Sequence, residues 1–492
     1  MRMAGVGAAL VALVAWSFWL RWQVLAASPF PLGVDGYFYP IQLRSLLEHG
    51  TLHYPAAPLA FWFMVPFAAI TDPIAGAKLG AALGGALIAL PAYALGARFG
   101  KRRGAGLVAA ALATTSAGST FLSIEFVKQG IGLTVALAAL WLVLRALDQI
   151  THVRVALAIA GVVAVLLTHK LAAALVIAIS IAATVEAARA RGSLRGRRLL
   201  FLLLGIVAVA LVALVLGIAM PQRFLSPTDI ALFGNLLTRH AHWSAPAMAL
   251  PKFTLTLGYE AAIGAVVAIA AAFALYFHRP KPHRAADRVA AWSCVVLAIA
   301  IGLPWLAVDD LQGLGFRLRT AAFVPLSLCA ATLVGALAPL AKQWREPALV
   351  VIAIVLALRG RHIRNEGRVI AHPALVAAAM AVKIPPGKTA IIPERHIMFM
   401  VAWYARAEVS LRPEPVPYAR RVRLMPLAFI GMDSPLDQAL DAARRTPGIE
   451  PPLGFHPRHR NGLVLVSEQT WEWILGGMPP AVMLHLLRWP TI

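Results

Sequence analysis

The chain has 492 residues, of which 60% are hydrophobic and only 14% are charged, and its mean hydropathy is +0.74. Soluble domains carry about 25% charged residues, so this composition excludes an ordinary soluble protein and indicates a chain embedded in lipid. The net charge of +23 does not indicate nucleic-acid binding, because the Lys and Arg residues fall mostly in short clusters between apolar runs, as membrane topology requires.

Apolar runs long enough to cross a bilayer recur through the first 358 residues. A transmembrane helix needs about 20 apolar residues. On that template the sequence predicts eleven spans, at residues 3–20, 77–99, 105–123, 130–147, 154–168, 171–187, 199–219, 259–277, 289–308, 320–341 and 346–358. We therefore expect an all-α polytopic membrane bundle in residues 1–358.

The basic clusters indicate how this bundle is oriented. With the N-terminus in the cytoplasm, the clusters at 101–103, 189–198 and 279–288 all fall in inner loops that are nearly free of acidic residues. The positive-inside rule therefore predicts a cytoplasmic N-terminus and, because the number of spans is odd, a C-terminus outside.

Two outer segments of the predicted bundle are long. The first, residues 21–76, contains an apolar stretch at 58–70 that is too short to cross and is interrupted by Pro66, so we expect an interfacial or re-entrant helix there. The second, residues 221–258, has the length of a functional lid or of a disordered loop.

The tail, residues 359–492, differs from the rest of the chain. Its hydropathy falls, and strand-like runs at 389–392 and 462–466 alternate with helix-like runs at 396–405 and 435–444. This alternation predicts a small C-terminal α/β domain on the outer face.

Asp35 is the most informative acidic residue, because it follows the first apolar run and lies in a glycine-flanked turn, Gly33-Val34-Asp35-Gly36. Glycines let the backbone bring a carboxylate close to a ligand, which suits a catalytic acid or base. Asp is equally a preferred helix cap, so the alternative is that Asp35 only caps the helix that follows.

Two further outer residues suggest a metal site. Glu125 lies in a turn between two predicted spans, and His169 ends another span on the same side. Together with Asp35 they form a tentative ligand set for a divalent cation such as Mg²⁺ or Mn²⁺. The alternatives are an interfacial pair between Glu125 and Lys128 and a hydrogen-bonded boundary role for His169.

Basic residues on the outer side run against the positive-inside bias and therefore need another explanation. Their donors suit phosphate oxygens, arginine above all because its planar fork binds two oxygens at once. Pairing of the arginines with Asp309 or Asp310 remains open, as does simple contact of a lysine with lipid headgroups. The candidate phosphate ligands are Lys128, Lys170, Arg317 and Arg319.

Taken together, these segments resemble the GT-C superfamily of integral-membrane glycosyltransferases, which includes oligosaccharyltransferases, protein O-mannosyltransferases and aminoarabinose transferases. The resemblance rests on the layout of the chain and on short motifs at 34–39, 46–50, 54–59, 100–104 and 167–169, with Arg317 near a late span. The paired acidic signature common in the family is missing, because Asp35 is followed by Gly36 and Tyr37.

The resemblance implies a function. Such enzymes transfer a sugar from a polyprenyl-phosphate-linked donor to a lipid, glycan or protein acceptor on the outer face of the membrane, here the bacterial cytoplasmic (inner) membrane. Asp35 would be the general base. The alternatives are a multi-pass transporter or lipid flippase, which the near absence of ionisable residues inside the predicted spans disfavours, and an inactive scaffolding relative.

Overall fold

The structure, a computed structural model, describes residues 3–191, 197–219, 251–277, 285–302, 314–338, 345–360, 373–392, 394–426 and 463–477. The chain divides into two compact units. The first consists of Met1–Ala27 and Thr51–Gly367, and the second of Ser28–Gly50 and Arg368–Ile492.

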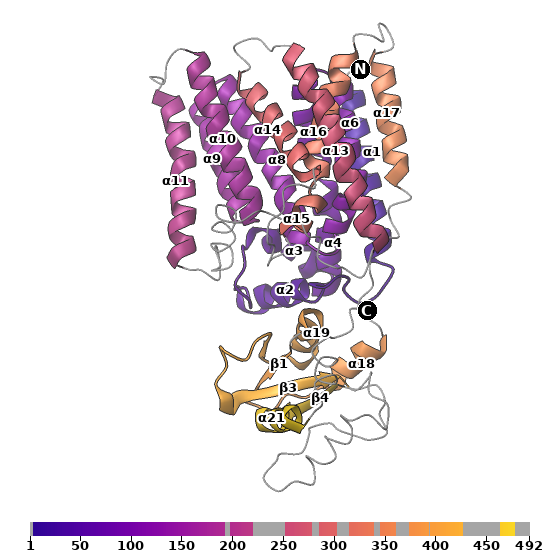
Figure 1. The fold of residues 1–492 in the computed structure, drawn as a ribbon, viewed down its shortest axis with the longest axis vertical. Coiled ribbons are helices and arrows are strands. Elements are labelled where there is room, and N and C mark those ends of the chain that lie inside the picture. Colours follow the sequence, from indigo (N-terminus) through magenta and orange to yellow (C-terminus); the bar gives the residue numbers. More distant parts are fainter. Residues whose placement is uncertain are drawn as a thin grey trace. The chain divides into compact units, whose positions relative to one another are not determined.

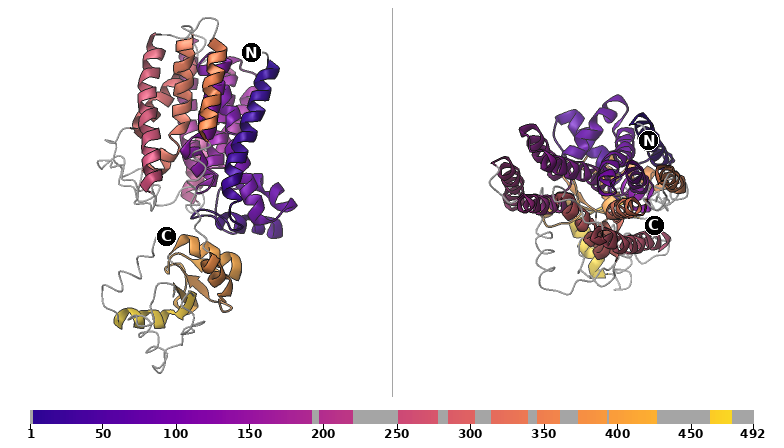
Figure 2. Two further views of the ribbon diagram at one scale, coloured as in Figure 1. Left: turned by 90° about the vertical axis from the view of Figure 1, so that its right-hand side faces the viewer. Right: turned by 90° about the horizontal axis from the view of Figure 1, so that it is seen from above.

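The first unit is a bundle of helices that run side by side (Figures 1 and 2). Its helices are α1 (Met3–Leu25), α3 (Leu59–Ile70), α4 (Pro73–Ala86), α5 (Ala89–Phe99), α6 (Arg103–Thr115), α7 (Ala117–Leu122), α8 (Val127–Asp148), α9 (His152–Leu166), α10 (Lys170–Ala190), α11 (Arg197–Ala219), α13 (Pro251–Phe277), α14 (Ala285–Gly302), α15 (Leu314–Thr320), α16 (Phe323–Leu337) and α17 (Arg345–Arg359).

By length and composition, seven helical segments of the described chain are able to cross a membrane. They are Ala4–Leu25, Pro73–Phe99, Val127–Asp148, Lys170–Ala190, Arg198–Ala219, Leu257–Phe277 and Ala285–Gly302. The other four predicted spans contain the shorter helices α6, α9, α16 and α17. The prediction of a polytopic helical membrane protein is therefore confirmed, with several spans shorter than the template.

One predicted span is interrupted for a visible reason. The run at 105–123 forms two helices, α6 and α7, because the backbone of Ser116 is extended and its hydroxyl accepts the N–H of Ser119 (3.2 Å) as the cap of α7. This break supplies polar side chains in the middle of an apolar bundle.

Arg21 of α1 uses those side chains. Its guanidinium is fully buried and donates to the Ser119 hydroxyl (2.6 Å), the Ser123 hydroxyl (2.9 Å) and the Thr114 carbonyl (3.0 Å), as well as to the Ser17 hydroxyl on its own helix. A charged group among apolar helices persists only where its donors are satisfied within the protein. These bonds therefore fasten α1 to the α6–α7 break.

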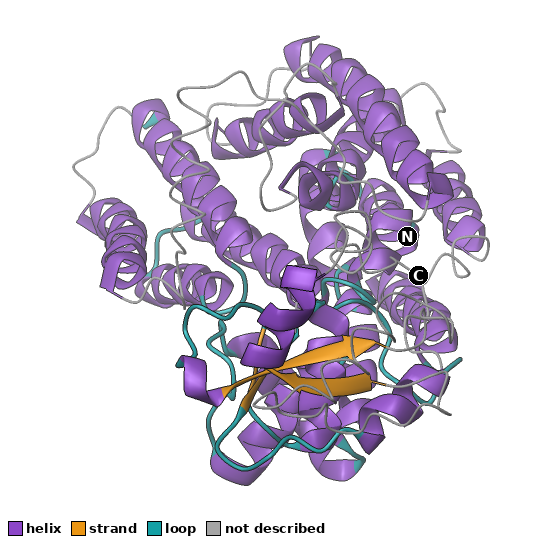
Figure 3. Ribbon diagram, turned by 60° about the horizontal axis from the view of Figure 1, so that its bottom comes forward, coloured by secondary structure: helices purple, strands orange, loops and turns teal. Residues whose placement is uncertain are grey.

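The second unit contains the expected α/β domain (Figure 3). Its elements are α2 (Phe38–His49), α18 (Pro373–Ala381), β1 (Thr389–Ile391), α19 (Arg395–Ala405), β2 (Val409–Ser410), the 3-10 helix η4 (Tyr418–Arg420), β3 (Arg421–Pro426), β4 (Leu463–Ser467) and α21 (Glu468–Gly477). The strand order is β2-β1-β3-β4, with β1 parallel to β2 and β3, and with β4 antiparallel to β3.

The strand-like runs at 389–392 and 462–466 correspond to β1 and β4, whereas β2 and β3 were not predicted. The helix-like run at 396–405 is α19, and the run at 435–444 lies outside the described residues. Of the outer segment at 221–258, residues up to 250 also lie outside them, and the remainder forms the start of α13.

Residues 28–50 pack with the C-terminal unit rather than with the helical bundle. From the sequence, the whole of 21–76 is expected to belong to the membrane module, because the segment lies between two apolar runs. In the structure α2 packs on α19 instead, and the aromatic rings of Phe38 and Phe399 are 5.1 Å apart. Chain proximity to a membrane helix did not determine where this loop packs.

We expect the second unit to depend on one buried ion pair. The carboxylate of Glu468, at the start of α21, accepts two bonds of 2.6 Å from Arg423 of β3. Glu468→Gln should lower the free energy of unfolding by about 3 kcal/mol, because a buried charge loses its partner. Thermal unfolding and limited proteolysis of the full-length protein measure this effect. Glu472→Gln, which removes the charge of a surface acceptor for the Tyr418 hydroxyl, is the control and should change stability by less than about 0.5 kcal/mol. Equal effects of the two substitutions would contradict the prediction.

Candidate functional site

Asp35 lies in the second unit, in the loop before α2, and faces α19. Its Oδ1 is 2.8 Å from Nε of Arg395, the first residue of α19. The Asp35 side chain is 16% exposed and that of Arg395 is 47% exposed. The carboxylate is therefore held by an ion pair while part of its surface remains accessible.

The glycines beside Asp35 are required by the backbone. Gly33 has a φ of +89°, in the region that side chains disfavour, and a Cβ on Gly36 would lie 2.6 Å from the carbonyl oxygen of Leu32. The sequence motif therefore forms a tight turn that fixes the direction of the Asp35 side chain.

The structure does not support the capping alternative for Asp35. Helix α2 has Tyr37 at its N-cap and no side-chain cap, and only the main-chain oxygen of Asp35 contributes, by accepting the N–H of Phe38 (3.0 Å). Oδ1 of Asp35 is buried and lies within ion-pair distance of Arg395. Within the described residues it accepts no hydrogen bond of normal geometry. The carboxylate thus keeps unused acceptor capacity.

Aromatic side chains of α19 surround the same loop. The hydroxyls of Tyr37 and Tyr404 are 3.1 Å apart, and burial, followed by this hydrogen bond, raises the pKa of Tyr37. Arg44 of α2 lies 4.3 Å from the centroid of the Trp403 ring and donates to the Trp403 carbonyl (3.0 Å). These contacts lock the Asp35 loop and α2 to α19.

A second group of predicted residues meets in the first unit, around His169. His169 lies between α9 and α10 and caps α10. Burial first, and then the positive charges of Lys128, Arg317 and Lys170, lower the pKa of His169 to about 3. The positive charges of three side chains thus act on a neutral imidazole at the junction of α9 and α10, where His169 packs against Gly132 of α8.

Neighbouring side chains fix these cations. The Arg317 guanidinium lies 5.2 Å from the ring centroid of Phe126, and Gln129 donates to the Arg317 carbonyl at 2.9 Å. The Lys128 ammonium lies 5.9 Å from the ring centroid of Phe61 on α3. Contact with aromatic faces stabilises cations that are partly removed from water.

A cavity of about 600 Å³ lies beside the helix that supports α15. Helix α7 packs so closely on α15 that a Cβ on Gly118 would collide with the carbonyl oxygen of Thr320. The N–H of Gly118 donates to Glu260 (3.1 Å), which lines the cavity together with Arg359 among mainly apolar side chains. The cavity therefore combines apolar walls with a few polar groups.

The remaining candidates behave differently. Glu125 is buried (3% exposed) in the turn between α7 and α8, and its N–H donates to the Phe121 carbonyl. Arg319 lies on α15, but its charge is not among those that act on His169.

Asp309 and Asp310, the alternative partners of the arginines, lie outside the described residues. Within the described ranges, no three His, Cys, Asp or Glu side chains lie close enough together to hold a metal ion.

Sequence reasoning did not identify Arg395 or Gln129. Arg395 is about 360 residues from Asp35 along the chain, and nothing in its local sequence distinguishes it from other basic residues. Gln129 lies in the outer turn just before the predicted span at 130–147, and nothing in the local sequence indicates that its side chain bonds to a residue near position 317.

The neutral state of His169 makes stability depend on pH. An unfolded chain protonates histidine below about pH 6.5, whereas the folded protein resists protonation down to about pH 3. The contribution of neutral His169 to the free energy of unfolding is therefore fully present above about pH 6.5, and it is lost as the pH falls below that value. Thermal unfolding from pH 7.5 to 5 should show a smaller decline for His169→Gln than for the wild type. His49→Gln, at an exposed histidine, is the control, and equal slopes for all three proteins would refute the assignment.

Comparison with known proteins gives similarity by structure alone. No protein-family model matches the chain, and no curated protein matches it significantly by sequence. The fold is similar to that of ArnT from Cupriavidus metallidurans bound to undecaprenyl phosphate, with a TM-score of 0.55 and 13% identity over 95% of this chain and 99% of that one. The same enzyme in the apo state gives a TM-score of 0.52 and 15% identity over 93% and 97%.

The third similar structure is the Archaeoglobus fulgidus oligosaccharyltransferase in complex with Zn and sulfate. Its TM-score is 0.50 and its identity 14%, over 82% of this chain. The match spans only 62% of the length of that enzyme. Both enzymes are GT-C glycosyltransferases, so the resemblance expected from the sequence is confirmed for the architecture: the chain is an integral multi-pass membrane protein with the GT-C fold.

Proposed function

We propose that this protein is a membrane glycosyltransferase that moves a sugar from a polyprenyl-phosphate-linked donor to an acceptor at the outer face of the membrane. In the structure Gln129, next to Lys128, donates to the Arg317 carbonyl (2.9 Å). A Cβ on Gly132 of α8 would lie 2.5 Å from Cβ of His169, the residue before Lys170. This packing of the segments that hold Lys128, Lys170 and Arg317 around His169 is the observation that carries the proposal. It occurs in a chain with the fold of a transferase whose structure was determined with undecaprenyl phosphate.

The cations suit the phosphate of the donor. Like charges repel when they gather in a poorly solvated place, and an anion relieves that repulsion. We assign Lys128, Lys170 and Arg317 to the phosphate, with Arg319 as a further candidate on the same helix. The 600 Å³ cavity beside α7 has the apolar lining that a prenyl chain requires.

Asp35 is our candidate for the general base. In the transfer, an acceptor hydroxyl oxygen forms a bond to the anomeric carbon while the bond from that carbon to the phosphate oxygen breaks. The carboxylate takes the hydroxyl proton, and the leaving phosphate keeps the bonding electron pair, which the cations that bind the phosphate stabilise. The ion pair with Arg395 orients the carboxylate, and its unused acceptor capacity suits proton transfer.

The tentative metal set of Asp35, Glu125 and His169 receives less support than the phosphate site. The archaeal oligosaccharyltransferase was crystallised with Zn and sulfate, which makes a divalent cation reasonable for this fold. Around His169, however, three positive charges disfavour the binding of a metal cation. No step of the proposed reaction therefore depends on a metal.

The orientation of the chain is also part of the proposal. The His169 cluster lies at the end of the bundle away from the basic loops, and the positive-inside rule assigns those loops to the cytoplasm. We accordingly propose a protein of the bacterial inner membrane, with the domain of residues 359–492 outside.

Asp35→Asn should abolish sugar transfer, a loss of at least about 100-fold in kcat, because the amide cannot accept the proton. Transfer from a defined polyprenyl-phosphate sugar to lipid, glycan and peptide acceptors measures this effect, with and without EDTA. Asp72→Asn is the matched control, because Asp72 caps α4 (2.8 Å to the N–H of Ile74) and touches neither group of candidates. Full activity of Asp35→Asn would show that Asp35 is not the general base. Loss of wild-type activity in EDTA would show that the reaction requires a divalent metal.

Arg317→Gln and Lys128→Gln should weaken binding of the lipid phosphate. Each charge-assisted bond contributes about 1.5–3 kcal/mol, so the Kd for polyprenyl phosphate should rise about tenfold or more. Binding is measured by titration of the purified protein in detergent. Arg154→Gln, at the other end of the bundle, should bind as the wild type does. Unchanged binding by both cluster variants would contradict the phosphate assignment.

A further inference from the structure

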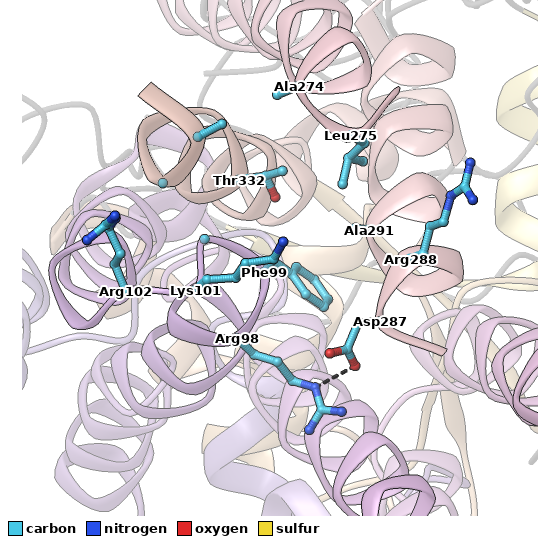
Figure 4. A pocket seen from close by; sticks show the side chains of 13 residues that line it. Arg98, Phe99, Lys101, Arg102, Ala274, Leu275, Asp287, Arg288, Ala291 and Thr332 are labelled. Carbon is cyan, nitrogen blue, oxygen red and sulfur yellow. Dashed lines mark hydrogen bonds and ion pairs between the residues drawn. The ribbon is translucent and has the colours of Figure 1, made fainter. Parts of the chain in front are cut away.

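The first unit has a second cavity, at the end of the bundle that carries the basic loops. It has a volume of about 190 Å³ and lies among the ends of α5, α13, α14 and α16 (Figure 4). Usual small-molecule pockets measure about 300–1,000 Å³, so this one suits a headgroup rather than a whole cofactor or nucleotide. Neither the His169 cluster nor Asp35 lines it.

The acidic residues at this cavity are already used. Arg98 forms ion pairs with Asp287 (Nε to Oδ1, 2.6 Å) and with Asp148 (2.6 Å), and the three residues join α5, α14 and α8. Figure 4 shows the first of these pairs at the cavity. The two carboxylates carry one negative charge more than Arg98 neutralises, but only Asp287 is among the residues that line the cavity, and four basic residues line it. The lining therefore has a net positive charge.

Three further basic residues line the same cavity: Lys101, Arg102 and Arg288. None of them forms an ion pair within the described part of the chain. Lys101 also has a left-handed backbone, with a φ of +54°, which is unfavourable for a residue with a side chain. Glycine would adopt this backbone conformation with less strain, yet the residue at this position in the wall of the cavity is a lysine.

Apolar side chains continue outward from the cavity. Phe99, Leu275 and Ala291 line it. Phe273 and Phe277, at the same end of α13, are 62% and 74% exposed. In a membrane-embedded bundle such exposed rings contact lipid chains, so a molecule held here has both an anionic group and hydrocarbon beside it.

We propose that this cavity binds the phosphodiester headgroup of an anionic membrane phospholipid, with its acyl chains along α13. Basic pockets between transmembrane helices at the cytoplasmic side are known to take such headgroups. Because it uses neither the His169 cluster nor Asp35, the proposal is independent of the transferase assignment.

Lipid retained by the purified full-length protein tests this proposal. The protein is exchanged into detergent with equal amounts of phosphatidylglycerol and phosphatidylcholine, and the bound lipid is counted by native mass spectrometry. The wild type should retain phosphatidylglycerol selectively. The Lys101→Gln/Arg288→Gln double variant should bind it about 30-fold more weakly, since each cation near an anionic lipid contributes about fivefold.

The control is Arg189→Gln, an exposed arginine at the same end of the bundle that does not line the cavity. It should retain lipid as the wild type does. If the double variant is unstable in thermal unfolding, Arg288→Gln alone, at an exposed position on α14, should give about a fivefold loss.

Three outcomes would overturn the proposal. Equal retention by the wild type and the cavity variants would show that the cavity is not the site. An equal loss in Arg189→Gln would show that only the overall positive charge matters. Displacement of the lipid by an equal concentration of glycerol phosphate would show that the cavity recognises a free phosphate rather than a lipid.

Discussion

The first unit depends on the accommodation of one fully buried charge, the guanidinium of Arg21, inside a bundle of mainly apolar helices. A guanidinium has five N–H donors, and lipid offers no acceptor for any of them. The protein supplies acceptors by ending α6 at Thr115 and starting α7 at Ala117, which exposes a carbonyl oxygen and two serine hydroxyls to Arg21. The break in the helix and the buried arginine therefore require each other.

This break also determines where the chemistry of the bundle is located. Helix α7 is short, so the chain turns at Glu125 and enters α8 with Lys128 in its first turn. The missing side chain of Gly118 allows α15 to pack against α7, which brings Arg317 to the same end. A continuous helix over 105–123, as the hydropathy predicts, would have no such turn. The convergence of cations on His169 is thus a consequence of an irregular span.

The fold class could be predicted from the sequence because the thickness of the bilayer determines the length of a span and its apolar interior determines the composition. The break at Ser116 could not be predicted, since serine and threonine side chains also satisfy their own hydroxyls in unbroken helices. In the tail, β3 was missed although Val422 and Leu424 are buried and alternate with arginines, the pattern of a half-buried strand. Strand β2 has only two residues, too few for any periodicity.

For the candidate site, the sequence identified scarce residues but not their partners. Asp35 is prominent because acids are rare and because glycines flank it, whereas Arg395 is one of 45 basic residues. The outer cations were identified because they violate the positive-inside bias, and three of the four act on His169. What no single sequence contains is the pairing of residues hundreds of positions apart, which depends on how the helices and the tail pack.

The composition of the second unit has a consequence for biosynthesis. Ser28–Gly50 leaves the ribosome early, but the α19 surface on which it packs is encoded after residue 394. At about 5–20 residues per second, the loop waits on the order of tens of seconds for its partner. During that interval Tyr37, Phe38 and the rest of α2 lack the contacts that they make with α19. The early loop is therefore a natural client for chaperones until the last quarter of the chain has been made.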